Sequence, residues 1–486
     1  LIITEGDSAS GTAHSGLLSG ADPEFTYEWY GVYGMKGVVV NSLKESIEIG
    51  KHGKRKGGMK KLSKPSPEEK STRKKKVVNE KKYNKKDRDI TRVPNAKTQN
   101  NERLSSLMKV LGLNFNHRYD FSPEGEKEFK TLRYGFIAGL TDQDVDGFNI
   151  FGLLVTFFIT YWPCLVRRNY IRRIYTPLIR AYPNSKKLKV KEFYFEEDYE
   201  DWARDVGEEK VRSTYKIRYY KGLGSHNKGW GEVKQMFKNI DSKLCVFILD
   251  EKAIKNMYIY YGDNTDLRKR ALSTPVTWKS VKGLEVPMSQ QFHRDTKLLQ
   301  RDNIIRKLLK LDGFVSSRRK VFFTVRMLKH NEEVKVKGLA GDVIKKADYH
   351  HGDSLSETII RMAQAYPNAR NLPLLRPLGE FGTRDRGYKN FAAPRYISTE
   401  FNYQLADKLF RREDDWVLKY GPDGFEPLYY VPIIPYSICE TNEIPGTGWV
   451  MNIHARDINA IFDNVRQMIK GKIKKCKKLP MWNKDL

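Results

Sequence analysis

The sequence predicts a multidomain protein that joins an α/β domain to an α+β region, and three observations support this prediction. The chain has 486 residues, which fits two to four domains. Its first half alternates strand patterns with helix patterns, as in an open α/β sheet. Its second half begins with successive helix patterns and then becomes extended. Since 40% of the residues are hydrophobic and 12% are aromatic, the chain can bury hydrophobic cores, and global disorder is excluded.

The α/β pattern begins with the first residues of the chain. Residues 1–4 form an apolar β run, and the segment EGDSASG at 5–11 predicts a tight turn followed by the start of a helix. Because this strand has no lead-in and no initiator Met, we expect the chain to be a fragment of a longer protein. Further strand candidates lie at 38–40, 131–140, 175–181 and 215–220.

One uncharged segment, at 150–166, resembles a membrane span. Its 17 residues are few for a span, and they include Thr156, Thr160, Tyr161 and Pro163. A buried core helix is the better interpretation, so we expect no membrane partner.

Helix patterns become dominant in the second half of the chain. Four of them follow one another with short turns between them, and a β pattern comes next. This order suggests a winged-helix type module. The four patterns lie at 304–311, 319–328, 341–347 and 354–366, an earlier short one lies at 104–111, and an extended pattern lies at 428–435.

The charge balance is strongly one-sided, with 88 Lys and Arg, 59 Asp and Glu, a formal net charge of +29 and a pI of about 9.6. Such a surplus favours a polyanionic partner, nucleic acid first and an acidic membrane surface second. The alternative is a protein that charge merely keeps soluble. The four cysteines form no CxxC pair, which argues against a disulfide framework or a structural zinc site and suits a reducing compartment.

A basic insertion, about residues 50–100, interrupts the α/β pattern. Residues 51–88 contain 17 Lys and Arg and four Asp and Glu, a net charge of +13, with few apolar residues. This composition predicts a solvated, mobile segment that tethers DNA electrostatically. A nuclear import signal, for which residues 54–56 are suited, is the competing interpretation.

Four carboxylates are candidate metal ligands. Asp142, Asp144 and Asp146 alternate just past a strand, where an extended backbone puts them on one side, and Glu5 follows another strand. Oxygen ligands favour Mg²⁺ or Mn²⁺ over zinc. The string also resembles half of an EF-hand loop, but the twelfth position, which needs Glu, is Leu153. A solvated acidic turn remains the plain alternative.

Seven ordered motifs resemble those of the type IIA DNA topoisomerases, and they extend over nearly the whole chain except the basic insertion. The first three are similar to motifs of the Toprim half of that family, and the other four to motifs of its tyrosine-bearing half. In chain order they are EGDSA at 5–9, DQDVDG at 142–147, YKGLG at 220–224, YHHGD at 349–353, GEFGTR at 379–384, AAPRYI at 392–397 and IPGTGW at 444–449.

The resemblance implies a domain order and an assembly. It places a Toprim domain at 1–180, the rest of the Toprim region and a linker at 181–286, a winged-helix domain at 287–420 and the start of a tower domain at 421–486. It implies double-stranded DNA as partner and a homodimer in which each tyrosine works against the other subunit's metal site. Toprim and tyrosine halves on one chain are the arrangement of eukaryotes and large DNA viruses, which implies the nucleus or a cytoplasmic viral replication site.

The resemblance also assigns the catalytic residues. Tyr396 is the nucleophile that attacks a DNA phosphodiester and forms a transient 5′-phosphotyrosyl double-strand break. A free phenol ionises only near pH ~10, so the nucleophile needs help. Arg395 is expected to stabilise the transition-state charge, and His351 to act as hydrogen-bond donor or proton relay.

Metal and DNA contacts follow from the same motifs. Glu5, Asp142 and Asp144 are expected to hold Mg²⁺, with Mn²⁺ as a possible substitute, while Asp146 supports a second ion or the loop. Pro445 replaces the isoleucine that kinks DNA in the family, and it can serve as a wedge together with Ile444. The expected phosphate contacts are Lys221, Arg319, Lys320, Lys335 and Lys337.

Three functions remain to be compared. The first is the cleavage and religation core of a type II topoisomerase, in which passage of a second duplex and the use of ATP belong to the full-length enzyme. The second is a nuclease that hydrolyses DNA with metal alone, and the third is a catalytically inactive DNA-binding scaffold. Tyr396 with Arg395 argues against the nuclease, and the intact carboxylates argue against the scaffold.

Overall fold

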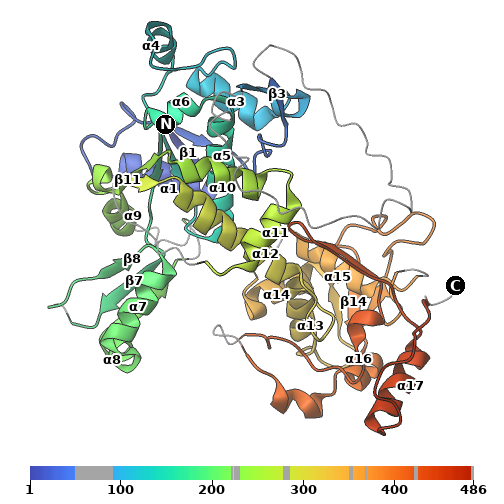
Figure 1. Ribbon diagram of the computed structural model, residues 1–486. Helices are drawn as coiled ribbons and strands as arrows, with labels where there is room; N and C mark the ends of the chain where they lie inside the picture. The colour runs from blue at the N-terminus through green and yellow to red at the C-terminus, as the bar shows by residue number, and fades with distance from the viewer. Residues whose placement is uncertain are drawn as a thin grey trace. The chain divides into compact units, whose positions relative to one another are not determined.

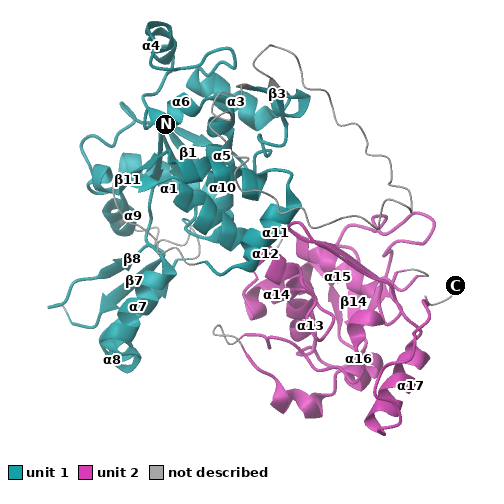
Figure 2. Ribbon diagram, viewed as in Figure 1, with its two compact units in different colours: residues 1–301 teal, residues 302–486 magenta. Residues whose placement is uncertain are grey.

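A computed structural model describes residues 1–49, 91–185, 187–220, 223, 230–276, 285–349, 354–366, 369–420 and 425–482. The chain divides into two compact units, Leu1–Arg301 and Asp302–Leu486 (Figure 2). Each unit has its own hydrophobic core, which confirms the multidomain prediction. The expected boundary at residue 287 lies within the first unit.

A six-stranded sheet forms the centre of the first unit (Figure 1). All neighbouring strands are parallel except β6 with β10. Every residue of β1 and β5 is buried, as is typical of strands covered on both faces. The predicted α/β sheet is therefore confirmed. In spatial order the strands are β11 (Glu285–Pro287), β10 (Leu244–Ile248), β6 (Ile171–Ile174), β5 (Ile137–Leu140), β1 (Ile2–Thr4) and β2 (Val32–Gly34).

Helix α5 (Val145–Tyr161) contains most of the uncharged segment and lies in the core of the first unit. Almost every residue from Gly147 to Thr160 is buried. The helix ends before Trp162, and Pro163 begins the short helix α6 (Pro163–Arg167), because proline cannot continue a helix. The prediction of a buried core helix is confirmed, and none of the helices in the described residues is long and apolar enough to cross a membrane.

The other elements of the first unit surround this sheet. A small antiparallel sheet has the order β8-β7-β9, and β3 pairs with β4 in a separate two-stranded ladder. The strands are β3 (Ser46–Ile49), β4 (Thr91–Pro94), β7 (Ile179–Pro183), β8 (Lys191–Phe193) and β9 (Tyr215–Tyr219). The helices include α1 (Asp7–Leu18), α2 (Ala96–Gln99), α3 (Glu102–Leu111), α4 (Pro123–Phe129), α7 (Glu196–Val206), α8 (Glu208–Thr214), α9 (Trp230–Phe237), α10 (Glu251–Tyr261) and α11 (Thr265–Ser273).

Two predictions for the first unit need correction. Residues 38–40 are not a strand, because positive φ angles at Lys36 and Gly37 turn the chain away once β2 has ended. Regular structure after the basic insertion returns with β4 at Thr91, earlier than predicted. Residues 50–90, which carry the predicted tether, lie outside the described residues.

Three helices and a three-stranded antiparallel sheet form the centre of the second unit, where Figure 1 shows α13, α14 and α15 beside β14. Strand β14 is the central strand, between β12 and β13. The predicted helices all exist, with shifted ends, whereas 428–435 contains no regular strand. The elements are α12 (Lys297–Lys307), α13 (Ser316–Val325), β12 (Glu333–Lys335), α14 (Val336–Ala347), α15 (Leu355–Ala363), β13 (Leu375–Leu378), β14 (Ser398–Phe401), α16 (Tyr403–Leu409), β15 (Asn442–Pro445), β16 (Val450–Ile453) and α17 (Ile458–Ile469).

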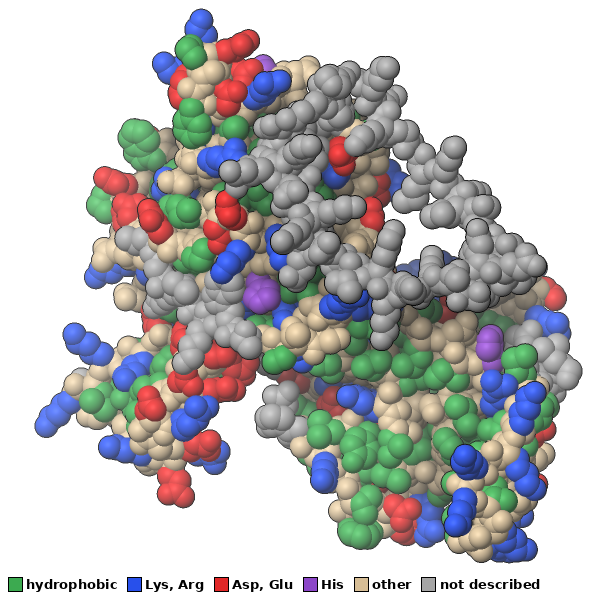
Figure 3. All heavy atoms as spheres, viewed as in Figure 1, with side chains coloured by type: hydrophobic (Ala, Val, Ile, Leu, Met, Phe, Trp, Pro, Cys, Tyr) green, Lys and Arg blue, Asp and Glu red, His purple; other side chains and the backbone are tan. Residues whose placement is uncertain are grey.

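Aromatic rings hold the core of the second unit together. Phe322 on α13 lies 4.8 Å from Phe410 and 4.9 Å from Tyr430, measured between ring centroids. Hydrophobic side chains also gather on the visible face of this unit (Figure 3). Among the exposed apolar residues is Trp416, which is 84% exposed.

Gly139→Val should destabilise the first unit. A Cβ atom at Gly139 would lie 2.5 Å from the ring of Phe151, which is fully buried in α5 and cannot move aside. We expect a loss of about 1–3 kcal/mol in the free energy of unfolding, measured by urea denaturation. Gly11→Ala on α1 is the matched control, because its Cβ would meet open space. Equal stability of the two variants would contradict this packing.

Candidate active site

The predicted carboxylates meet at one edge of the central sheet. Because β1 and β5 pair in parallel with Thr4 opposite Leu140, Glu5 and the loop 141–147 leave the sheet at the same edge. Asp144 begins helix α5, where its Oδ1 accepts a hydrogen bond from the backbone N–H of Gly147 at 2.7 Å. Asp142 is held by the backbone N–H of Leu223, whose nitrogen lies 2.7 Å from Oδ1.

The electrostatics of this acidic group are unfavourable for negative charge. Burial, followed by the charges of Asp142 and Asp144, raises the pKa of Glu5 to about 7. Burial also raises the pKa of Asp142, to which Asp144 adds, although the N–H of Leu223 opposes the shift. Among the described residues, Glu5 Oε2 is buried and has no hydrogen-bond partner.

These observations fit a hard divalent cation such as Mg²⁺. The donors are carboxylate oxygens, one of them buried without a hydrogen-bond partner, and a cation would offset the repulsion among them. Within the described ranges, no three Asp, Glu, His or Cys side chains already converge as a group that could hold an ion. Binding would therefore require the carboxylates to move closer together.

Tyr396 lies in the second unit on a well-anchored turn just before β14. Its side chain is 66% exposed, while the backbone around it is fixed. The N–H of Lys337 donates to the carbonyl of Pro394 at 3.2 Å, and the N–H of Val336 donates to the carbonyl of Ile397 at 3.0 Å. The strand pairing of β12 with β14 thus presents the phenol to solvent on a rigid support.

Three basic side chains accompany the tyrosine. The guanidinium of Arg395 lies over the ring of Tyr396, 4.8 Å from its centroid. Lys335 is exposed, and its Nζ donates to the backbone carbonyl of Tyr396 at 3.3 Å. Lys337 is also exposed, on the first turn of α14. An exposed phenol among three cations is suited to meet a phosphate.

Two of the other predicted DNA contacts serve internal structure. Arg319 is buried, and its Nε and Nη2 bind the two oxygens of Asp312 at 2.7 and 3.0 Å. We therefore correct its expected phosphate contact to a structural ion pair, because its guanidinium is enclosed and already bidentate. Lys320 is mostly buried and pairs with Glu426 at 2.7 Å. Lys221 and His351 lie outside the described residues.

The predicted wedge lies at the tip of a two-stranded hairpin. Ile444 and Pro445 end β15, where Pro445 is opposite Val450 and is exposed. The N–H of Gly446 donates to the carbonyl of Trp449 at 2.6 Å and closes the turn. The tip is therefore a short, apolar and ordered projection.

The sequence did not reveal four arginines that line one pocket of the second unit. They are Arg318, Arg361, Arg370 and Arg384. They come from four separate segments and follow no local spacing, so no sequence motif could have found them.

Glu5→Gln should stabilise the protein against heat at pH 8 in the presence of a chelator. The raised pKa of Glu5 means that its charge opposes folding fully above about pH 7, and not at all below the ordinary value of 4.5. We expect Tm to rise by roughly 2 °C at pH 8 and by much less near pH 5. Circular dichroism melting measures this, with the exposed Glu24→Gln as control. A variant whose Tm matches the parent at pH 8 would contradict the repulsion.

Comparisons with known proteins agree with this geometry. Residues 309–484 match the DNA gyrase/topoisomerase IV family, and residues 174–310 match the C-terminal associated domain of TOPRIM. The chain is similar over its full length to a crystal structure of the Plasmodium falciparum topoisomerase II DNA-binding, cleavage and re-ligation domain. The TM-score is 0.72 and the identity 25%, and the match covers 58% of that chain.

Curated relatives give the same result. DNA topoisomerase 2 of African swine fever virus (isolate Tick/Malawi/Lil 20-1/1983) is 34% identical over 487 residues, which cover 96% of this chain and 37% of the relative. DNA topoisomerase 2-beta of Homo sapiens is 31% identical over 495 residues, which cover 97% of this chain and 26% of the relative. The chain thus spans about a third of the viral relative and about a quarter of the human one. It belongs to the type IIA DNA topoisomerase family.

Proposed function

We propose that this chain is the DNA cleavage and religation core of a type II topoisomerase. In this proposal the first unit contains the Toprim domain, and the second contains the winged-helix domain and the start of the tower domain. The observation that carries the proposal is the exposed phenol of Tyr396 on an anchored turn, with Arg395, Lys335 and Lys337 around it. A buried tyrosine could not reach a phosphodiester.

Tyr396 is the nucleophile of the proposed reaction. Its hydroxyl oxygen forms a bond to the phosphorus, the bond from phosphorus to the 3′ oxygen breaks, and the proton of the phenol passes to His351 or to water. Arg395 stabilises the added charge on the phosphoryl oxygens. Because the phosphotyrosyl ester keeps the energy of the broken bond, the 3′ hydroxyl can attack it and restore the DNA.

The acidic group supplies the second half of the site. Glu5, Asp142 and Asp144 would hold Mg²⁺, or Mn²⁺ in its place, with Asp146 supporting a second ion or the loop. The bound ion would stabilise charge on the leaving 3′ oxygen. Glu5 must give up its proton for this purpose, while the N–H groups of Leu223 and Gly147 orient Asp142 and Asp144.

The assembly around this core is part of the proposal. Two copies would form a homodimer on double-stranded DNA, each offering Tyr396 to the partner's acidic group. Passage of a second duplex with ATP would need regions that the longer relatives contain. Matches to both a large DNA virus and a mammal support either the nucleus or a viral replication site in the cytoplasm.

One experiment tests the proposed function directly. The protein is incubated with supercoiled plasmid and Mg²⁺, and the reaction is stopped with detergent. Protein attached covalently to 5′ ends is the expected result. Free, unattached ends would indicate a metal-dependent nuclease and overturn the proposal.

Tyr396→Phe should abolish covalent attachment and leave DNA binding within roughly 0.5 kcal/mol of the parent. The exposed ring keeps its place over the turn, and only the attacking oxygen is lost. Detergent-trapped cleavage and fluorescence anisotropy measure the two effects. Tyr420→Phe, which also removes an exposed phenol from the second unit, should behave like the parent. Residual attachment in the Tyr396 variant would point to another nucleophile.

Asp142→Asn should raise the Mg²⁺ concentration for half-maximal cleavage at least about tenfold, with little change in DNA affinity. The amide keeps an oxygen that can accept from Leu223, so the loop should stay in place while a charged ligand is lost. A titration of cleavage against Mg²⁺ measures this. The exposed Asp205→Asn on α7 is the matched control. A superimposable Mg²⁺ curve would refute the role of Asp142.

A further inference from the structure

A pocket of about 530 Å³ in the second unit gathers four arginines. Arg318 comes from α13, Arg361 from α15, Arg370 from the segment before β13, and Arg384 from the loop that leads to Tyr396. The volume is typical of ligand sites, which are about 300–1,000 Å³. Polar groups dominate the remaining lining, and Glu443 is the only carboxylate among the lining residues.

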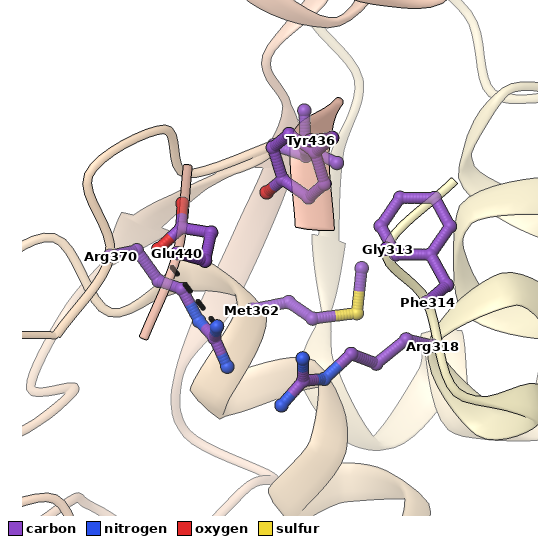
Figure 4. A pocket seen from close by; sticks show the side chains of 8 residues that line it. Gly313, Phe314, Arg318, Met362, Arg370, Tyr436 and Glu440 are labelled. Atoms are coloured by element: carbon purple, nitrogen blue, oxygen red, sulfur yellow. Dashed lines mark ion pairs between the residues drawn. The ribbon is translucent and has the colours of Figure 1, made fainter. Parts of the chain in front are cut away.

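A smaller cavity that shares Arg318 and Arg370 with this pocket is drawn in Figure 4. A dashed line there joins Arg370 to Glu440, 4.0 Å away. Glu440 is only 2% exposed and already accepts hydrogen bonds from the backbone N–H groups of Asn371 and Leu372. A carboxylate that is so engaged and so distant offsets the charge of Arg370 only partly.

The positive charge of the pocket is incompletely neutralised. Within the described residues, Arg318 has no carboxylate within 4.0 Å and donates only to the amide oxygen of Asn442, at 2.9 Å. Burial, and then the nearby charge of Arg370, lowers the pKa of Arg318 to about 9. Arg361 pairs with Glu357, yet its Nε is buried without a partner in the described part of the chain. Such groups are costly to bury unless an anion completes them.

We propose that this pocket binds a phosphodiester of the DNA backbone beside the wedge hairpin. Guanidinium groups offer paired N–H donors whose geometry matches phosphate oxygens. Ile444 of the hairpin also lines the pocket, and Arg384 lies twelve positions before Tyr396 on the same connection between β13 and β14. The ligand therefore lies between the residue that would unstack DNA and the residue that would cleave it. This inference rests on the proposed function.

A site of this kind would help the duplex to bend. Unstacking one base step kinks the helix, and the deformation brings some phosphates closer together. Cations placed at that point reduce the repulsion between those phosphates, so part of the deformation energy is offset by the protein. The arginines would thus act as positioning residues and would not touch the reacting atoms.

The test uses the full chain with the double substitution Arg318→Met and Arg384→Gln. Neither change removes the partner of a buried carboxylate, so the fold should be retained, which circular dichroism melting checks. We expect DNA affinity at low salt to fall about tenfold, and the slope of log affinity against log salt to decrease by about 0.9 for each lost phosphate contact. Arg204→Gln on α7, an exposed arginine of the first unit, should leave both values unchanged.

The remaining outcomes are distinguishable. An unchanged slope in the double variant overturns the inference, while detergent-trapped cleavage by the parent protein would still support the proposed function. If inorganic phosphate raises the Tm of the parent but not of the variant, and the DNA slope is unchanged, the pocket takes a free anion and not the duplex. If the double variant fails to fold, Arg384→Gln alone, an exposed position, must still reduce the slope for the inference to stand.

Discussion

The parallel pairing of β1 with β5 is the constraint on which the acidic group depends. Residues 5 and 142 are far apart in the chain, yet Thr4 lies opposite Leu140, so both segments end at one sheet edge. Helix α5 then starts at Asp144 and buries its apolar length in the core, which fixes the loop from behind. The hydrophobic free energy of this packing holds carboxylates together that would separate if they were free to move.

The two units solve opposite electrostatic problems. In the first, carboxylates are held close and partly dehydrated, so that a cation gains more than it would in water. In the second, guanidinium and ammonium groups surround an exposed phenol and a pocket, so that an anion gains in the same way. Neither arrangement favours the isolated protein. Both are typical of sites whose stabilising partner arrives from outside.

The sequence was sufficient where chemistry follows local order. Alternating aspartates after a strand, an apolar stretch with a proline near its end, and a Tyr beside an Arg are all local patterns, and their elements appear where expected. It was insufficient where tertiary contacts decide. Three valines at 38–40 have strand propensity but follow a turn, and Arg319 looks like an exposed helix residue until Asp312 folds against it. The four pocket arginines share no pattern, because only the fold brings α13, α15 and two loops together.

The ladder of β3 with β4 has a consequence for how this protein can change over evolution. Four residue pairs, from Ser46 with Pro94 to Ile49 with Thr91, join the two ends of the intervening segment outside the central sheet. The entropy of closing a flexible loop grows only with the logarithm of its length, so a doubling costs about 0.6 kcal/mol. Insertions and deletions between these strands should therefore be nearly neutral for folding, and homologues are free to exchange this segment as a cassette.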